Sequence, residues 1–503
     1  MDIASGLIDG FLVALTPINL MWCFVGCFLG TVVGVMPGLG PAATIAMLLP
    51  LTFQMNPTSG LIMLSGIYYG AKYGGSTTSI LLNVPGESSS VVTCLDGYQM
   101  ARKGRAGAAL GIAAIASFIA GTFGVVALML IAPPLAKFAL SFSSPEYFAL
   151  MALGLAMVVL LAGKSLVKAL LAMLVGLWIA SMGTDLFTAV SRFTFGNSEM
   201  LDGVDFVVVA IGIFAIGEVL GNMETREGTS VLPVPKGLRN LLPTMAELKA
   251  CRFAFLNGSV VGFVIGILPG AGSTIASFIS YGLEKAVSKH PEKFGTGVPE
   301  GVAAPEGANN SETGGALVPM LTLGIPGSST TAILLAALVL WGLKPGPLMI
   351  QDNPTLFWGL VASMYIGNVM LLVLNIPLIP LFAQILRLPA ALLYPVIFGI
   401  SIVGVYSVSG SLFDVWMLAV FGLLGYVMRK LDYPSAPLIL GLVLGDSMER
   451  ALRQSLMMSQ GDLGILVSRP ISAVMLALAV LVLLLPTFRK ANSWRVKALE
   501  ENG

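Results

Sequence analysis

The stretch Gly34-Val35-Met36-Pro37-Gly38-Leu39-Gly40 interrupts an apolar run that would otherwise form one membrane helix. Its pattern of small residues and proline returns later in the chain. Gly30, Gly34, Pro37, Gly38 and Gly40 recur as Gly262, Gly266, Pro269, Gly270 and Gly272. In lipid, a Pro-Gly break frees backbone N–H and C=O groups and persists only where protein or a water-filled cavity covers it. Paired breaks in two halves of a chain indicate a transporter's substrate site, and the duplication favours this over kinks made only for packing.

The composition is that of a membrane protein. Of 503 residues, 56% are hydrophobic and only 11% are charged, against about 25% charged in a typical soluble protein. The net charge of +1 leaves no basic surface for nucleic acid. The N-terminal run has no basic region or cleavage pattern before it, so we expect it to remain in the protein.

At about 20 apolar residues per crossing, the sequence predicts an all-α polytopic membrane protein with about a dozen transmembrane segments. We expect a first transmembrane repeat over residues 1–221 and a polar cytoplasmic linker over 222–252. A second repeat covers 253–446, and an amphipathic segment, a last transmembrane helix and a cytoplasmic tail cover 447–503. The first apolar run is predicted as Phe11–Met36, and a broken segment in the second repeat as Gly314–Trp341.

Further matches extend the repeat beyond the first motif. Gly74-Gly75 resembles Gly314-Gly315, and the stretch from Val84 to Ser88 resembles the stretch from Ile325 to Ser329. Each repeat is therefore predicted to contain two re-entrant or broken helices. The four structural breaks are Pro37, Pro85, Pro269 and Pro326.

Basic residues predict that the two repeats are inverted. Lys and Arg in short loops mark the cytoplasmic side of a membrane protein. In the first repeat they follow the second broken motif, whereas in the second repeat they follow the first one. The residues concerned are Arg102, Lys103 and Arg105 in the first repeat and Lys285, Lys289 and Lys293 in the second.

The breaks come with polar side chains that suit an anion and a coupling ion. The N-terminal ends of half-helices carry partial positive charge at membrane depth and hold anionic groups well. The predicted substrate-binding residues are Gly38, Gly40, Lys72, Ser76, Thr77, Asn83, Gly270, Gly272, Ser273, Thr274, Ser328 and Ser329. The predicted ligands of a coupling ion, sodium or a proton, are Asn309, Asn310, Glu312 and Thr330.

Lys72 is the most informative charge because it lies inside an apolar segment. A cation there costs at least ~2.5–3.5 kcal/mol, so it needs a partner or a cavity. Two roles remain open: a counter-charge for the substrate, or an ion pair with Glu87 or Glu312. Glu218 and Asp446 are either ion ligands or acids at helix ends.

Motifs of catalysis are missing from the chain. It contains no Gly-x-Ser-x-Gly elbow, no His-Glu-x-x-His and no Walker lysine motif. We therefore expect a transporter and not an enzyme, with no metal and no cofactor other than the coupling ion. The alternatives are a passive organic-anion channel and an intramembrane enzyme.

Several long motifs resemble one known family. Gly-Val-Met-Pro-Gly-Leu-Gly-Pro-Ala-Ala-Thr, Tyr-Tyr-Gly-Ala-Lys-Tyr-Gly-Gly-Ser-Thr-Thr and Leu-Thr-Leu-Gly-Ile-Pro-Gly-Ser are similar to the large membrane subunit of bacterial tripartite tricarboxylate transporters, the TctA type. The resemblance spans nearly the whole chain. Asn309-Asn310-Ser311-Glu312-Thr313 departs from it, because an apolar residue is expected where Glu312 stands.

This resemblance implies a multi-pass secondary transporter of the bacterial inner membrane. It implies uptake of small carboxylates such as citrate, driven by a sodium or proton gradient. Its partners would be a small transmembrane subunit, a periplasmic substrate-binding protein, the carboxylate itself and membrane lipid, and a homo-oligomer is compatible with it.

Overall fold

The computed structural model describes residues 3–36, 39–161, 165–185, 187–224, 232, 241–385 and 390–484. Most of them lie in helices, and the strands in these ranges form a single two-stranded sheet. The chain divides into two compact units, and each unit draws on both halves of the sequence. The larger unit comprises residues 1–139 and 205–430, and the smaller one comprises residues 140–204 and 431–503.

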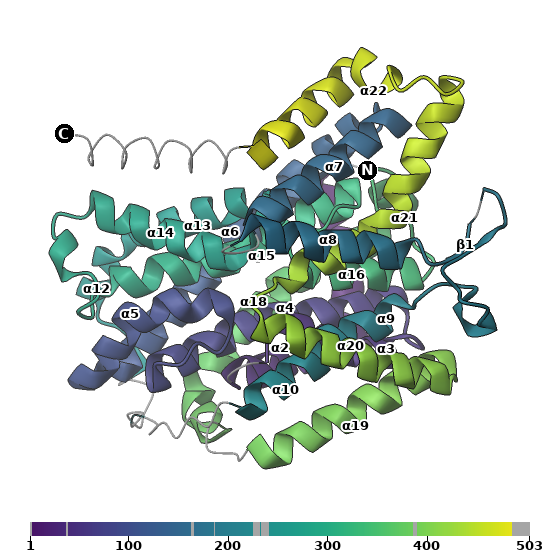
Figure 1. Ribbon diagram of the computed structural model, residues 1–503. Helices are drawn as coiled ribbons and strands as arrows, with labels where there is room; N and C mark the ends of the chain where they lie inside the picture. The colour runs from purple at the N-terminus through teal and green to yellow at the C-terminus, as the bar shows by residue number, and fades with distance from the viewer. Residues whose placement is uncertain are drawn as a thin grey trace, which may run out of the picture. The chain divides into compact units, whose positions relative to one another are not determined.

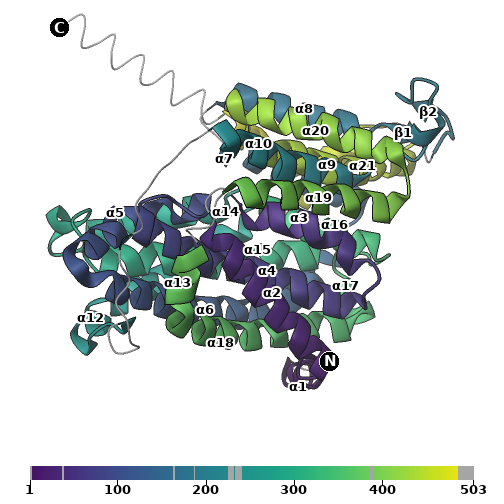
Figure 2. The same cartoon turned by 90° about the horizontal axis from the view of Figure 1, so that it is seen from below.

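Every described element of the larger unit is helical (Figure 1 and Figure 2). Its first part contains α1 (Ile3–Ala14), α2 (Pro17–Val35), α3 (Pro41–Thr52), α4 (Pro57–Leu82), η1 (Ser88–Ser90), α5 (Val91–Met100), the π-helical η2 (Ala101–Arg105) and α6 (Ala106–Ala139). It continues with α9 (Phe206–Ala210), the π-helical η4 (Ile211–Ile216), α10 (Gly217–Glu224), α12 (Met245–Ala250), α13 (Arg252–Ile267), α14 (Gly272–Val287) and η5 (Pro291–Lys293). It ends with α15 (Glu300–Leu323), α16 (Ser329–Leu340), α17 (Met349–Asp352), α18 (Pro354–Ile385), α19 (Ala390–Ser409) and α20 (Leu412–Lys430).

The smaller unit is built around α21, which packs against α7 and α8. Its strands β1 and β2 are antiparallel, with Gly183 opposite Arg192. Its elements are α7 (Ser144–Leu161), α8 (Leu166–Ala180), β1 (Gly183–Thr184), β2 (Ser191–Arg192), η3 (Ser198–Met200), α21 (Ser435–Met458), α22 (Ile465–Ser468) and an apolar helix over Pro470–Leu484.

Six helical stretches of the described chain are long and apolar enough to cross a membrane. They are Pro17–Val35, Ser88–Ala139, Ser144–Leu161, Phe206–Glu224, Pro354–Phe382 and Leu412–Lys430. Shorter apolar helices accompany them. The prediction of an all-α polytopic membrane protein is confirmed, whereas the inverted orientation of the repeats stays a prediction.

Two predicted boundaries are wrong. The broken segment of the second repeat does not begin at Gly314, because α15 already begins at Glu300. The polar residues before Gly314 interrupt the apolar run in the sequence, yet α15 is buried from Gly301 to Thr322. The run Phe11–Met36 is two helices, since Pro17 opens α2, where its missing N–H and fixed φ suit the first helical position.

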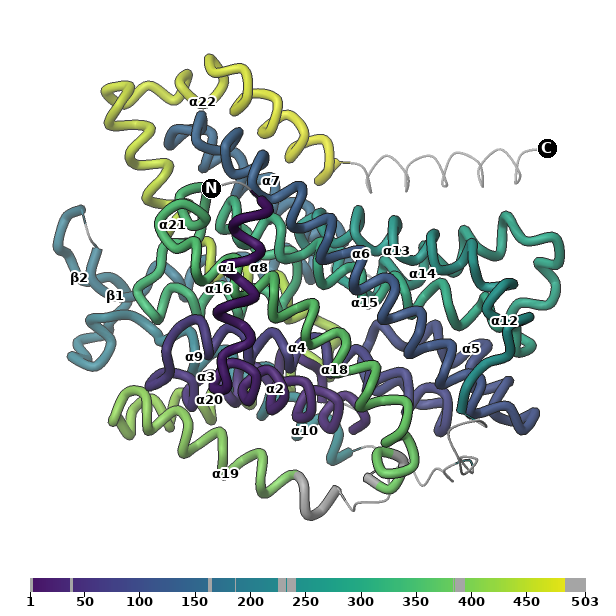
Figure 3. The backbone as a smooth tube through the Cα atoms, turned by 180° about the vertical axis from the view of Figure 1, so that it is seen from behind, coloured from purple at the N-terminus to yellow at the C-terminus, as the bar shows by residue number. Residues whose placement is uncertain are grey.

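Glycines bring α2 against α4 and α13 against α15 at very close range (Figure 3). A Cβ built on Gly30 would lie 2.4 Å from the carbonyl oxygen of Ile67. A Cβ on Gly262 would lie at the same distance, 2.4 Å, from that of Ala308. The same relation links Gly26 to Met63, Gly34 to Ala71, Gly258 to Ala304 and Gly266 to Glu312. The second helix pair therefore repeats the contacts of the first.

These contacts set the register of the repeat in α4 and α15. Gly74 faces the carbonyl oxygen of Thr31, and Gly315 faces that of Phe263, the residue equivalent to Thr31. Gly74 thus corresponds to Gly315, one residue beyond the match to Gly314 predicted from the sequence. A two-residue glycine match leaves the register open by one position, whereas backbone contact does not.

The two helices also end in the same way. Asn83 follows α4 with φ 60°, and Gly324 follows α15 with φ 70°. Both conformations are left-handed, and they end a helix by turning the chain away. The next helix begins with a capping box in both cases. Glu87 pairs with Ser90 in the first half, and Ser328 pairs with Thr331 in the second.

The glycine contacts predict a position-dependent effect of adding one methyl group. Gly30→Ala should lower the stability of the chain by about 1–3 kcal/mol, because the new Cβ overlaps the α4 backbone. Gly282→Ala, in the exposed part of α14 with open space around it, should be neutral or stabilising by up to ~1 kcal/mol. Unfolding midpoints of the purified chain in detergent measure both. Equal effects of the two substitutions would contradict close α2–α4 packing.

An ion-pair cluster connects the strand pair of the smaller unit to α21. Asp185 Oδ2 lies 2.9 Å from Arg453 Nη2 and 3.7 Å from Arg192 Nε. Glu449 Oε1 lies 2.8 Å from Arg192 Nη1. The Phe187 N–H donates to Asp185 Oδ1 at 2.8 Å. This hydrogen bond and the one from Arg453 lower the pKa of Asp185 below its ordinary value of 3.8.

The lowered pKa of Asp185 predicts an acid-sensitive contribution to stability. It is fully present above the ordinary pKa and is lost as the pH falls through the lowered, folded-state pKa. Asp185→Asn should therefore lower the unfolding midpoint at neutral pH. The gap between the unfolding midpoints of the variant and the native chain should shrink below about pH 4. Asp432→Asn, at an exposed aspartate of the same unit, should leave the pH profile unchanged. A difference for Asp185→Asn that stays constant down to low pH would contradict this assignment.

Candidate functional site

The broken helices of the larger unit contact each other where their chains turn. The N–H of Gly270, in the break between α13 and α14, donates to the carbonyl oxygen of Gly327 at 2.8 Å, in the break between α15 and α16. Gly270 has φ 80°, a backbone conformation that residues other than glycine rarely adopt. Pro37 and Gly38, of the equivalent break between α2 and α3, lie outside the described residues.

Lys72 lies in the middle of α4 and is only 3% exposed. Its ammonium donates to Ser273 Oγ at 2.6 Å and lies 3.3 Å from Glu87 Oε2. The Tyr68 ring is next to it, with its centroid 5.5 Å away. Of the two acids predicted as its partner, Glu87 is the one within ion-pair distance. The buried charge of Lys72 is therefore held at the first turn of α14, to which Ser273 belongs.

Two reciprocal contacts connect α4 and α15 to the helix caps. Asn309 Nδ2 of α15 donates to Glu87 Oε1 at 3.0 Å, and Glu87 caps η1 in the first half. The Tyr68 hydroxyl of α4 donates to Glu312 Oε2 at 3.1 Å. The same hydroxyl lies 3.4 Å from the Oγ of Ser328, the residue that caps α16 in the second half. In the register of the repeat, Tyr68 corresponds to Asn309. Each half thus reaches across to the cap of the other.

The approach to this site is less buried than its centre. Thr274 Oγ1 donates to Ser88 Oγ at 3.0 Å, and Ser88 is exposed. At Gly272 and at its equivalent Gly40, no atom lies within 4 Å of an added Cβ. These glycines are at the N-terminal ends of α14 and α3, where first-turn N–H groups have no partner inside the helix. A small anion could reach the backbone at Gly272, whereas the backbone N–H of Gly40 already interacts with the Glu218 carboxylate.

Glu306 is a buried acid that the sequence analysis missed. It is 0% exposed, and its carboxylate accepts hydrogen bonds from the hydroxyls of Ser76 and Thr93. The segment predicted from the sequence begins at Gly314 and therefore does not include Glu306. An intramembrane acid is a signal of function, and a helix prediction that extended through the polar run would have found it.

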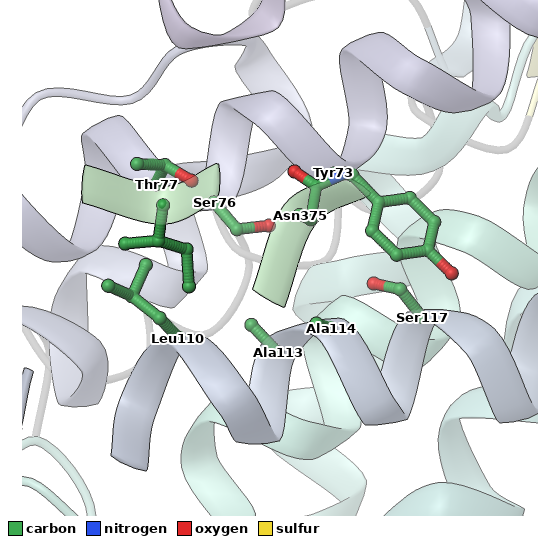
Figure 4. Close-up of a pocket in the computed structure, with 9 residues that line it drawn as sticks. Tyr73, Ser76, Thr77, Leu110, Ala113, Ala114, Ser117 and Asn375 are labelled. Atoms are coloured by element: carbon green, nitrogen blue, oxygen red, sulfur yellow. The ribbon is translucent and has the colours of Figure 1, made fainter. Parts of the chain in front are cut away.

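Among the described residues, the other predicted ones do not contact the Lys72 ammonium. Ser76 and Thr77 line a small cavity with Tyr73, Ser117 and Asn375 (Figure 4). Asn310 Nδ2 donates to Ser117 Oγ at 2.7 Å, which turns it toward α6. Asn83 is the exposed C-cap of α4. Three of the predicted prolines lie in turns: Pro85 after α4, Pro269 after α13 and Pro326 after α15. Ser329 and Thr330 lie in the first turn of α16.

Glu218 and Asp446 both have basic partners. Glu218 Oε1 lies 3.7 Å from Arg429 Nη1 in the larger unit. Asp446 pairs with Arg450 one helical turn further along α21. Glu218 lies in the first turn of α10, whereas Asp446 lies in the middle of α21 and not at a helix end.

Comparisons with known proteins identify the family of the chain. Residues 20–440 match the model of the tripartite tricarboxylate transporter TctA family. A protein of Agrobacterium vitis described as "Uncharacterized 52.8 kDa protein in TAR-I ttuC' 3'region" is 48% identical over 492 residues, which cover 97% of this chain and 98% of the relative. A second, "Uncharacterized protein in TAR-II ttuC' 3'region", is 45% identical over 231 residues, or 45% of this chain and 96% of the relative. No solved structure matches. The chain therefore belongs to the tripartite tricarboxylate transporter TctA family and is a multi-pass membrane protein.

Proposed function

We propose that this chain is the transport subunit for secondary active uptake of small carboxylates, tri- or dicarboxylates such as citrate, across the bacterial inner membrane. Uptake is coupled to a sodium or proton gradient. A periplasmic binding protein delivers the substrate, and a small transmembrane subunit completes the transporter. Membership of the TctA family supports this assignment.

The position of the Lys72 ammonium is the observation that carries the proposal. It contacts Ser273 in the first turn of α14, beside the less buried hydroxyls of Thr274 and Ser88. A cation, hydroxyl donors and unpaired N–H groups at a half-helix end together form a site for a carboxylate. The substrate would bind at this end of α14, with Lys72 supplying the charge beneath it.

The charge balance around Lys72 supports coupling to a cation. Glu87, Glu306 and Glu312 are all buried within this region, and Lys72 is within ion-pair distance only of Glu87 among the described residues. Two carboxylates thus lack a basic partner in the low-dielectric interior, where an unpaired charge is very costly. Binding of protons or metal cations would offset this cost and favour the simultaneous binding of an anion.

Uptake into proteoliposomes tests the proposal. The chain and its small partner are reconstituted and supplied with labelled citrate or with a panel of di- and monocarboxylates. Each assay runs with and without the binding protein, with an imposed sodium or proton gradient and without ATP. We expect accumulation that requires both the gradient and the binding protein. Flux that never exceeds the substrate's own electrochemical gradient and needs no binding protein would instead assign a passive anion channel.

Substitution of Lys72 separates its two possible roles. Lys72→Gln should reduce uptake at least about tenfold, because it removes a charge-assisted hydrogen bond to the carboxylate. It also leaves Glu87 buried without its cation, so Lys72→Gln combined with Glu87→Gln restores neutrality. The double variant should fold and still fail to transport. Lys285→Gln, at an exposed lysine of α14, should transport like the native chain.

The double variant can also contradict a role of Lys72 in substrate binding. If it folds and accumulates substrate at the native rate, Lys72 serves only as the partner of Glu87. The carboxylate must then bind without that ammonium, at the helix ends alone.

A further inference from the structure

Three buried oxygen atoms on α15 have no hydrogen-bond partner among the described residues. They are Asn309 Oδ1, Glu312 Oε1 and Thr313 Oγ1. The residues are 0%, 0% and 1% exposed, and their spacing of three and four positions places them on adjoining parts of one helix face. Buried polar groups in proteins nearly always have a partner, so a set of three indicates a bound water or ion.

The repeat shows what lies at the matching place in the first half. The backbone contacts that pair Gly74 with Gly315 also pair Lys72 with Thr313. In the first half, the residue at this position is a lysine, whose ammonium lies 3.3 Å from a carboxylate oxygen of Glu87. In the second half, the equivalent residue is a short, neutral threonine. Its neighbour in the chain is an acid, Glu312.

Glu312 has fewer hydrogen-bond donors than the other buried acids around Lys72. No basic side chain of the described residues lies within ion-pair distance of Glu312, and among these residues it accepts its hydrogen bond from the Tyr68 hydroxyl at 3.1 Å. Glu306 also lacks a cation, but hydroxyl donors occupy both of its oxygens. Glu312 leaves one oxygen without a donor. It is therefore the acid at which a cation can still bind.

We infer that a sodium ion binds to this face of α15, held by Glu312 Oε1, Thr313 Oγ1 and Asn309 Oδ1, around the residue that corresponds to Lys72. One carboxylate with two neutral oxygens suits a monovalent ion. A divalent ion prefers more oxygens and more carboxylates, and the described residues contain no cluster of three or more metal-ligating acids, histidines or cysteines. A proton on Glu312 could donate to only one of the other two oxygens.

This site refines the predicted set of ion ligands. Thr313 replaces Asn310, whose amide is bonded to Ser117, and Thr330, which lies in the first turn of α16. The inference rests on the proposed transport function for the role of the ion in coupling. Sodium binding itself is independent of that role and is measured on the purified chain without substrate.

The test measures binding of sodium chloride to the full chain in detergent, with choline chloride as the reference salt. Radioactive sodium bound at equilibrium gives the affinity, and the rise of the unfolding midpoint with sodium gives a second readout. We expect saturable binding by the native chain. Glu312→Gln should abolish it, and Thr313→Val should weaken it at least about tenfold, as loss of a partner at a metal site commonly does. Thr313→Ser, which keeps the hydroxyl, should restore most of the affinity.

Thr322→Val is the matched control. Thr322 is also buried in α15, but its hydroxyl donates to the Val318 carbonyl at 2.7 Å. The same substitution there should leave sodium affinity unchanged. Thr313→Lys should place a tethered ammonium at the position equivalent to Lys72, where it would compete with the sodium ion. That variant should be as stable without sodium as the native chain is with it, and should no longer bind sodium.

The outcomes are distinct for this inference and for the proposed function. A native chain without saturable sodium binding would overturn the site and leave a buried water or a protonated Glu312 in its place, even if a proton gradient drives uptake. Equal loss of affinity in Thr313→Val and Thr322→Val would overturn it as well. Sodium binding with the expected variant pattern in a chain that transports nothing would support the site and contradict the proposed function.

Discussion

The structure depends on one constraint, that backbone groups freed by a broken helix inside a membrane must find partners in the protein. The N–H of Gly270 meets this constraint by donating to the carbonyl of Gly327, so that one break is bonded to another. Capping boxes at Glu87 and Ser328 satisfy the first N–H groups of the helices that follow the other two described breaks. Because each break needs a neighbouring segment, the breaks gather at one place.

The helices that meet at the breaks contain charged side chains in a region that little water can reach. α4 and α15 are buried around their whole circumference, yet they contain Lys72, Glu306 and Glu312. A buried helix of an ordinary core would be apolar throughout. Hydroxyl groups of Tyr68, Ser76 and Thr93 bond the acids here. The buried charges of these helices are thus surrounded by hydroxyl groups, and acids outnumber bases among them.

The two halves share a backbone plan but differ in their chemistry. Glycine contacts, left-handed helix ends and capping boxes correspond residue by residue. However, the residue of the second half that corresponds to Lys72 is Thr313, and the one that corresponds to Glu87 is Ser328. Close helix packing demands glycine in both halves, since any side chain would meet backbone. The side chains that face the breaks are free of this demand, and there the two halves differ.

The sequence by itself determined the membrane class, the positions of the breaks, the existence of a repeat and the need of Lys72 for a partner. These follow from local composition and from spacing along the chain. Only the tertiary structure decided that Glu87 is that partner, that Gly74 matches Gly315, and that Glu306 belongs to the buried network. The reason is physical: Ser273 and Lys72 are 201 positions apart, and Tyr68 and Glu312 are 244 apart. Which of several acids reaches a buried lysine depends on helix packing, which no short stretch of sequence encodes.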